Sequence, residues 1–216
     1  MYLLNLDDPS GDIVVALDIG SNITRIGMHN GEHKILASHG YPFDDKGPVY
    51  MGEARLTNRE SVSLKYALYI LANVSDKFVD QYPMIQKLRQ HDSPAFRQKL
   101  RAAILNLLRT AREWALANMR KHWRIHRLCV NTPGHWGIEF HRVLLPLIGD
   151  AFKWNMRMTT EKVSFTFSTD SLTHYLLGKN FQTGSKLSQV WLVLQYGGHA
   201  LVCDSYTLGL INAKYY

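Results

Sequence analysis

Near the beginning of the chain, apolar and polar positions alternate with the period of two that is typical of β-strands. Such runs cover Asp12–Asp18, Thr24–His29 and His33–Ser38, and short polar connections separate them. The second connection contains an Asn-Gly pair, which favours a tight hairpin turn. The pattern therefore predicts three short strands that pair as an antiparallel meander.

Beyond a Gly- and Pro-punctuated loop over Tyr41–Leu56, the apolar positions recur every three to four residues, which is the helical period. Ser61–Ala72 begins a helical stretch that we expect to continue or restart around Asp76–Tyr82. A long helix follows, with Ser93 as its N-cap and Pro94 at its first position. The apolar face of this helix comprises Phe96, Leu100, Ile104, Leu107, Ala111 and Trp114.

After the long helix, strand and helix patterns alternate. We expect a strand over Ile125–Asn131, a helix over Ile138–Trp154 that is bent or interrupted at Pro146, a strand over Lys162–Phe167 and a helix over Ser168–Gly178. Strands joined through crossover helices pair in parallel. The order of elements therefore predicts an α/β fold, with a mixed five-stranded sheet and flanking helices on both of its faces.

The last part of the chain repeats an arrangement found in the first part. A strand at Val190–Leu194 ends at Gln195, and a pair of glycines precedes a second strand at Ala200–Tyr206. In the same way, Asp18 ends the first strand of the chain, and Gly20 lies in the turn that follows. Two glycine-turn hairpins separated by a helix-rich insert indicate an internal duplication.

Asp18 is the first candidate for chemistry, because it ends an apolar run in which an unpaired carboxylate would be costly. A cation, a bound water or a ligand phosphate with its metal could meet this charge. The small residues Gly20, Ser21 and Asn22 follow directly and would let a ligand approach the backbone closely.

Composition places the chain among globular proteins, because 46% of its residues are hydrophobic and 20% are charged. No apolar run approaches the roughly 20 residues that span a bilayer, so we expect no membrane segment and a cytoplasmic location. Cys129 and Cys203 lie in apolar runs without metal-ligand spacing, and we interpret both as small buried hydrophobic residues.

The formal net charge of +7 arises mainly between Gln86 and Arg127, where basic residues far outnumber acidic ones. Most of this block belongs to the long helix that begins at Pro94. We favour the interpretation that the basic residues form the solvated outer face of this helix. The alternative is that these residues bind phosphate or an acidic partner. Nucleic-acid binding through residues 94–123 is a further hypothesis that rests on the same charges. We do not expect nucleic acid as a partner.

The two glycine hairpins, "LDIGSNITRIGM" and "WLVLQYGGHALVCDSYTL", resemble the phosphate-holding hairpins of the actin, sugar-kinase and heat-shock-chaperone ATPase superfamily. The order of elements resembles the nucleotide-binding domain of seventy-kilodalton heat-shock chaperones, particularly the divergent chaperone-like proteins of fungi. The resemblance implies a ribonuclease H-like (actin-like ATPase) lobe that binds ATP or ADP with Mg²⁺.

The resemblance also implies roles for individual residues. Asp18 would hold Mg²⁺ through water and take part in catalysis, as such a hard cation prefers oxygen ligands. Lys65 is the candidate for the catalytic lysine of the family. Phosphate contacts fall on both hairpins, at Gly20, Ser21, Asn22, Gln195, Gly197 and Gly198.

Two departures from the family pattern bear on activity. Gln195 stands where the second hairpin usually has an aspartate, and Ser168 or Thr169 stands where a glutamate is expected. A neutral amide supplies no negative charge for a metal-bound or attacking water. We therefore expect a degenerate catalytic site with little or no ATP hydrolysis, so that the chain is at most a weak ATPase.

The resemblance divides the chain into a first lobe, residues 1–188, and the opening hairpin of an incomplete second lobe, residues 189–216. We expect an ATP-binding, chaperone-like domain fragment. One alternative is a protein-interaction scaffold without nucleotide, derived from the same fold, and the other is nucleic-acid binding through the basic helix. A hairpin without the rest of its sheet exposes unpaired strand edges, so we expect self-association or a polypeptide partner through residues 189–216.

Overall fold

In a computed structural model of the protein, the chain is described over residues 11–20, 23–28, 33–37, 39–42, 49–50, 61–75, 79–133, 136–167, 190–196 and 201–207. Several predictions from the sequence fall outside these ranges. They concern Ser21, Asn22, Gly197, Gly198 and the helix expected over residues 168–178.

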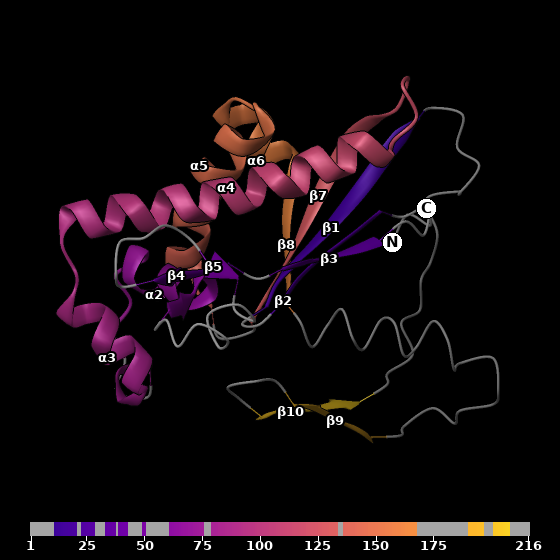
Figure 1. Cartoon of the computed structure of the whole chain (residues 1–216). Helices are drawn as coiled ribbons and strands as arrows, with labels where there is room; N and C mark the ends of the chain where they lie inside the picture. Colours follow the sequence, from indigo (N-terminus) through magenta and orange to yellow (C-terminus); the bar gives the residue numbers. More distant parts are fainter. Residues whose placement is uncertain are drawn as a thin grey trace.

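The main sheet is mixed and has the strand order β3-β2-β1-β7-β8 (Figure 1). Its strands are β1 (Asp12–Ile19), β2 (Ile23–Met28), β3 (His33–Ala37), β7 (Arg124–Thr132) and β8 (Val163–Phe167). The first three strands pair antiparallel, whereas β7 is parallel to β1 and β8 is parallel to β7. The α/β class, the antiparallel meander and the parallel later strands are thus confirmed.

A second, small sheet was not predicted. It has the order β5-β4-β6 and consists of β4 (His39–Pro42), β5 (Val49–Tyr50) and β6 (Ser61–Ser63). The prediction of a helix from Ser61 was wrong by three residues, because Ser61–Ser63 pair with β4 and the helix begins at Leu64. The backbone of Ser63 is extended, and its hydroxyl accepts a hydrogen bond from the Lys65 amide at 3.3 Å, as an N-cap does.

The helices are α2 (Leu64–Leu71), the 3-10 turn η1 (Val79–Gln81), α3 (Pro83–Gln90), α4 (Pro94–Asn118), α5 (Ile138–Phe152) and α6 (Met156–Lys162). The predicted start of α4 is confirmed, because the Ser93 hydroxyl accepts a hydrogen bond from the Phe96 amide at 3.2 Å. Helix α5 continues through Pro146 and is not interrupted there. It ends at Lys153, whose left-handed backbone (φ 59°) stops the helix, and α6 then precedes β8.

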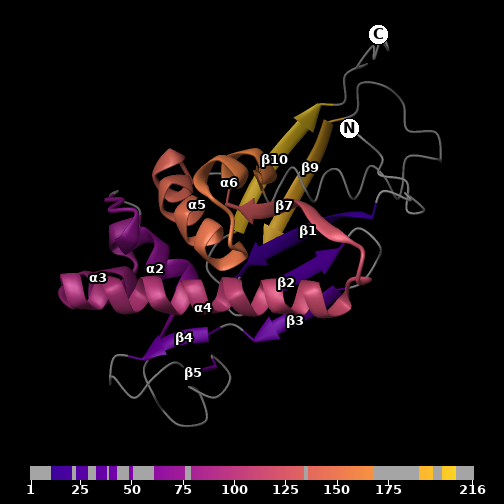
Figure 2. The same cartoon turned by 90° about the horizontal axis from the view of Figure 1, so that it is seen from above.

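The core lies between one face of the main sheet and the helices α4 and α5. Alternate residues of β1, namely Val15, Leu17 and Ile19, are buried on this face, and α4 and α5 run along it (Figures 1 and 2). Buried side chains of α4, such as Leu100 and Ile104, belong to the same hydrophobic cluster. The predicted apolar face of α4 therefore packs on the sheet, while its basic residues Arg101 and Arg109 are exposed.

We expected helices on both faces of the sheet. The structure confirms them on the face that α4 and α5 cover. The helix predicted over residues 168–178 lies outside the described residues, and no described helix packs on the opposite face. That opposite face carries the candidate site.

The two strands near the end of the chain form a sheet of their own. Here β9 (Val190–Tyr196) pairs antiparallel with β10 (Leu201–Thr207), which confirms the predicted hairpin pairing. The division of the chain at residue 188 stays a prediction. None of the described helices combines the length and the apolar character needed to cross a bilayer.

Candidate functional site

Asp18 lies one residue before the end of β1, on the sheet face that points away from α4 and α5. Its neighbours Leu17 and Ile19 are buried in the core, whereas the Asp18 side chain keeps 35% of its surface exposed. The interpretation that the strand carries Asp18 into apolar surroundings was wrong, because successive strand residues point to opposite faces of a sheet. The carboxylate therefore lies at the surface and is accessible to a ligand.

Two side chains that sequence reasoning missed contact this carboxylate. Arg25 of β2 lies opposite Asp18 in the antiparallel register, and its Nη1 is 3.3 Å from Asp18 Oδ2. Asn131 of β7 lies opposite Asp18 on the other side, and its amide Nδ2 donates to Asp18 Oδ1 at 3.3 Å. The sequence left a cation, a bound water or a ligand phosphate with its metal open as partners of this charge, and the structure supplies a cation, which is an arginine of the protein itself.

The same register extends the polar row to a fourth strand. Thr166 of β8 lies opposite Asn131, so that Arg25, Asp18, Asn131 and Thr166 follow one another across the sheet. Because β1, β7 and β8 are parallel, their carboxyl ends meet at this edge. In α/β sheets this is the edge at which ligands usually bind.

A hollow of about 520 Å³ lies beside this row on the same sheet face. Its floor contains Ala16, Gly27 and Cys129, which face one another across β2, β1 and β7. These small side chains leave space, while the charged side chains of Asp18 and Arg25 line its margin together with Lys34. Cys129 is half-buried rather than fully buried, and its sulfur lies 3.3 Å from Ser164 Oγ.

Lys65, the second residue of α2, comes close enough to Asp18 for the two charges to act on each other. Burial lowers the pKa of the Lys65 ammonium group, and the negative charge of Asp18 partly offsets this effect by raising the same pKa. The structure therefore brings the two residues predicted as catalytic into one region, although they are far apart in the sequence.

The remaining predicted contacts are less fully described. Gly20 directly follows β1, two residues after Asp18. Gln195 lies in β9 opposite Val202, in the separate two-stranded sheet, and its contact with a phosphate stays a prediction. Ser21, Asn22, Gly197 and Gly198 lie outside the described ranges.

A resident metal centre would need a cluster of ligating side chains. Within the described part of the chain, no group of three or more His, Cys, Asp or Glu residues is arranged to hold a metal ion. Asp18 alone still fits Mg²⁺ that arrives with a polyphosphate, because this ion commonly takes one or two protein carboxylates, substrate phosphates and several waters.

No known family profile matches the sequence, and no curated protein matches it. Similar solved structures include a MamK double helical filament, at 14% identity and a TM-score of 0.37. The matched region covers 78% of the present chain and 44% of the MamK chain. They also include a non-polymerising MamK mutant bound to AMPPNP, at 12% identity and a TM-score of 0.35, with coverages of 91% and 55%. The chain spans about half the length of these proteins.

Proposed function

We propose that this protein binds the phosphates of a nucleoside triphosphate, with ATP as the candidate, at the edge of the sheet around Asp18. The observation that carries the proposal is the convergence of Asp18, Arg25 and Asn131 beside the hollow, with Lys65 close by. Neighbouring strands supply three of these groups from one register row, so the sheet itself holds them in place.

The charges at this edge suit a polyanion that carries a divalent cation. Arg25 and Lys34 line the hollow and Lys65 lies near Asp18, whose carboxylate is the one acidic group among the described lining residues. Arginine donates to phosphate oxygens through its planar fork, and lysine contributes a compact positive charge. When the triphosphate binds, its oxygens would accept hydrogen bonds from Arg25 in place of Asp18. The Asp18 carboxylate would then contact the magnesium ion through water.

In its finer form, the proposal is an ATP-binding, chaperone-like domain fragment with a degenerate site. Gln195 stands where the family pattern has an aspartate, and Ser168 stands where it has a glutamate, so neither position supplies a carboxylate. Loss of one positioned charged group commonly lowers turnover by a factor of about 100 or more. We therefore expect binding of ATP or ADP with little or no phosphate release.

Isothermal titration calorimetry of the whole chain with MgATP, MgADP and metal-free ATP tests the proposal. Asp18→Asn should weaken MgATP binding at least tenfold, whereas metal-free ATP should be much less affected, because the carboxylate acts through the metal. Asp12→Asn is a matched control, since Asp12 begins the same strand and also pairs with an arginine, Arg124. Absence of MgATP binding, or equal losses in both variants, would contradict the proposal.

The second candidate function is a protein-interaction scaffold that has kept the fold without nucleotide. The existing ion pair between Asp18 and Arg25 favours it, because a carboxylate already met by a cation needs no metal. In that case MgATP produces no heat in the titration, and neither variant changes this result.

A further inference from the structure

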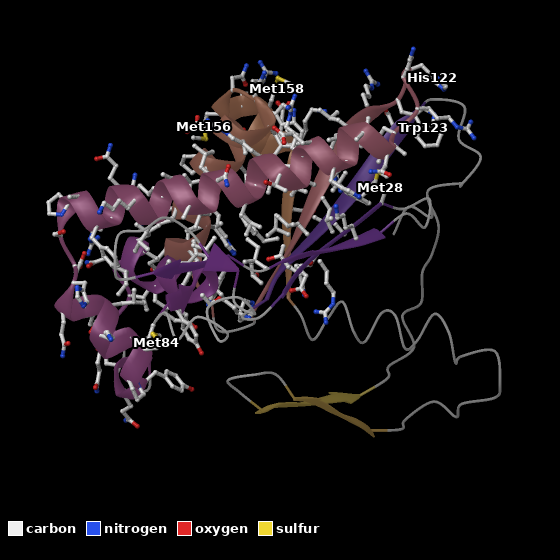
Figure 3. All side chains as sticks on the ribbon, viewed as in Figure 1. Met28, Met84, His122, Trp123, Met156 and Met158 are labelled. Atoms are coloured by element: carbon white, nitrogen blue, oxygen red, sulfur yellow. The ribbon has the colours of Figure 1, made fainter. Side chains whose placement is uncertain are left out.

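The corner at which α4 ends and β7 begins carries a dense group of positive charges. In the eight residues from Arg120 to Arg127, every polar side chain is exposed, and only Trp123 and Ile125 are partly or fully buried. Figure 3 shows His122 and Trp123 at this corner, at the far end of β1 from the Asp18 site. The permanently charged members are Arg120, Lys121, Arg124 and Arg127.

An irregularity in the strand pairing turns two successive side chains of this corner outward. In the register between β1 and β7, Ile13 lies opposite Ile125 but Val14 lies opposite Arg127, so that His126 is the extra residue of a bulge. Bulges commonly re-aim side chains in this way. As a result both His126 and Arg127 are exposed, where regular alternation would have directed one of them into the core.

The described residues neutralise only part of this charge. Asp12 pairs with Arg124 at 2.5 Å and lies 3.5 Å from His126. Within the described part of the chain, Lys121 and Arg127 have no acidic partner. The ammonium group of Lys162 adds further positive charge, because it donates to the Ile125 carbonyl oxygen at 3.2 Å.

Arg120 is held in a position from which it can stack on a ligand. Its guanidinium carbon lies 4.7 Å from the centre of the Trp123 ring. Trp123 in turn packs closely on Gly11, where an added Cβ would come within 2.9 Å of the indole Cδ1. The side chain of Arg120 is exposed, so its guanidinium group is accessible to solvent while the indole supports it.

We propose that this corner, residues 120–127, is a binding site for single-stranded nucleic acid. Unpaired cations would contact successive phosphates, and an unstacked base would stack on Arg120 and so extend the Trp123–Arg120 pair. A lipid surface fits less well, because the exposed side chains from Arg120 to Arg127 are all polar and offer no apolar group for insertion. The site lies on the short corner rather than along α4, whose outward residues include Glu113.

The test measures binding of the 216-residue chain to fluorescently labelled single-stranded RNA and DNA of about 20 nucleotides, over a range of salt concentrations. A duplex of the same length and vesicles that contain phosphatidylserine are titrated in parallel. Lys121→Ala with Arg127→Ala should weaken binding about 60-fold at about 0.05 M salt and lower the salt slope by about 1.4, as expected for two lost phosphate contacts to a single strand. The matched control is Arg101→Ala with Arg109→Ala, which removes the same charge from the exposed face of α4. This control should retain both the affinity and the slope to within about twofold.

Arg120→Lys keeps the charge but removes the planar group, so it should weaken single-strand binding about fivefold or more while the salt slope is unchanged. Thermal melting confirms that each variant is folded. Three results would overturn the proposal: no binding of either oligonucleotide at low salt, equal losses in the corner and control variants, or preferential binding to duplex or to phosphatidylserine vesicles. Unchanged affinity of the Arg120→Lys variant would overturn the preference for single strands.

Discussion

The ion pair between Asp18 and Arg25 should contribute little to folding, and this is the central prediction for the candidate site. The charged atoms are 3.3 Å apart, and the side chains are 35% and 58% exposed, respectively. At this distance the Coulomb energy ranges from about 1 kcal/mol in water to about 5 kcal/mol at an effective dielectric constant near 20. Dehydration and side-chain ordering offset most of it, and exposed pairs typically contribute about 0.2–1 kcal/mol.

A double-mutant cycle of Asp18→Asn and Arg25→Gln measures this contribution directly. Urea unfolding of the four proteins, followed by circular dichroism, should give a coupling free energy of at most about 1 kcal/mol. The coupling should decrease further at high salt, because screening acts strongly on exposed pairs. Asp18→Asn alone should leave the denaturant dependence of the unfolding free energy unchanged.

The size of the coupling distinguishes two roles for the pair. A weak pair can be exchanged for contacts with a ligand phosphate, as the proposed function requires. A coupling above about 2 kcal/mol would refute this reasoning, because it would identify the pair as a structural element of the sheet that a ligand could not readily displace.

Three further predictions concern the remainder of the fold. The Trp136 indole N–H donates a hydrogen bond to the Tyr69 hydroxyl at 3.1 Å, and both side chains are buried. Tyr69→Phe removes the acceptor and should lower the unfolding free energy by about 1–3 kcal/mol in urea titrations. An unchanged unfolding free energy would show that water replaces the hydroxyl. The hydrogen bond from Arg124 lowers the pKa of the Asp12 carboxyl, so its contribution to stability is present above pH about 4 and is lost as the pH falls through the lower folded-state value. Melting temperatures should therefore fall less steeply below pH about 4 in Asp12→Asn than in the unaltered chain, and identical profiles would contradict this. Deletion of residues 189–216 should reduce concentration-dependent light scattering without unfolding residues 1–188, and a 216-residue chain that is monomeric at all concentrations would contradict self-association through this segment.

Local sequence signals predicted those parts of the fold that depend on neighbouring residues. The period of two located β1 and β2, and the Ser93-Pro94 pair located the start of α4. Where pairing with a distant segment competed with local preference, the prediction failed. Ser61–Ser63 continue the helical pattern of α2 in the sequence, yet they form β6, because β4 offers them backbone partners.

The sequence by itself determined the order of the five main-sheet strands and of the helices α4 and α5 between them, and it placed Asp18 near a strand end beside Gly20. Only the tertiary structure decided which side chains surround Asp18. Arg25 is seven residues away and Asn131 is 113 residues away, and both face the carboxylate because the sheet register aligns them. Hydrophobic periodicity is a local property that can be read along the chain, whereas register depends on the pairing of distant strands, which no single segment specifies.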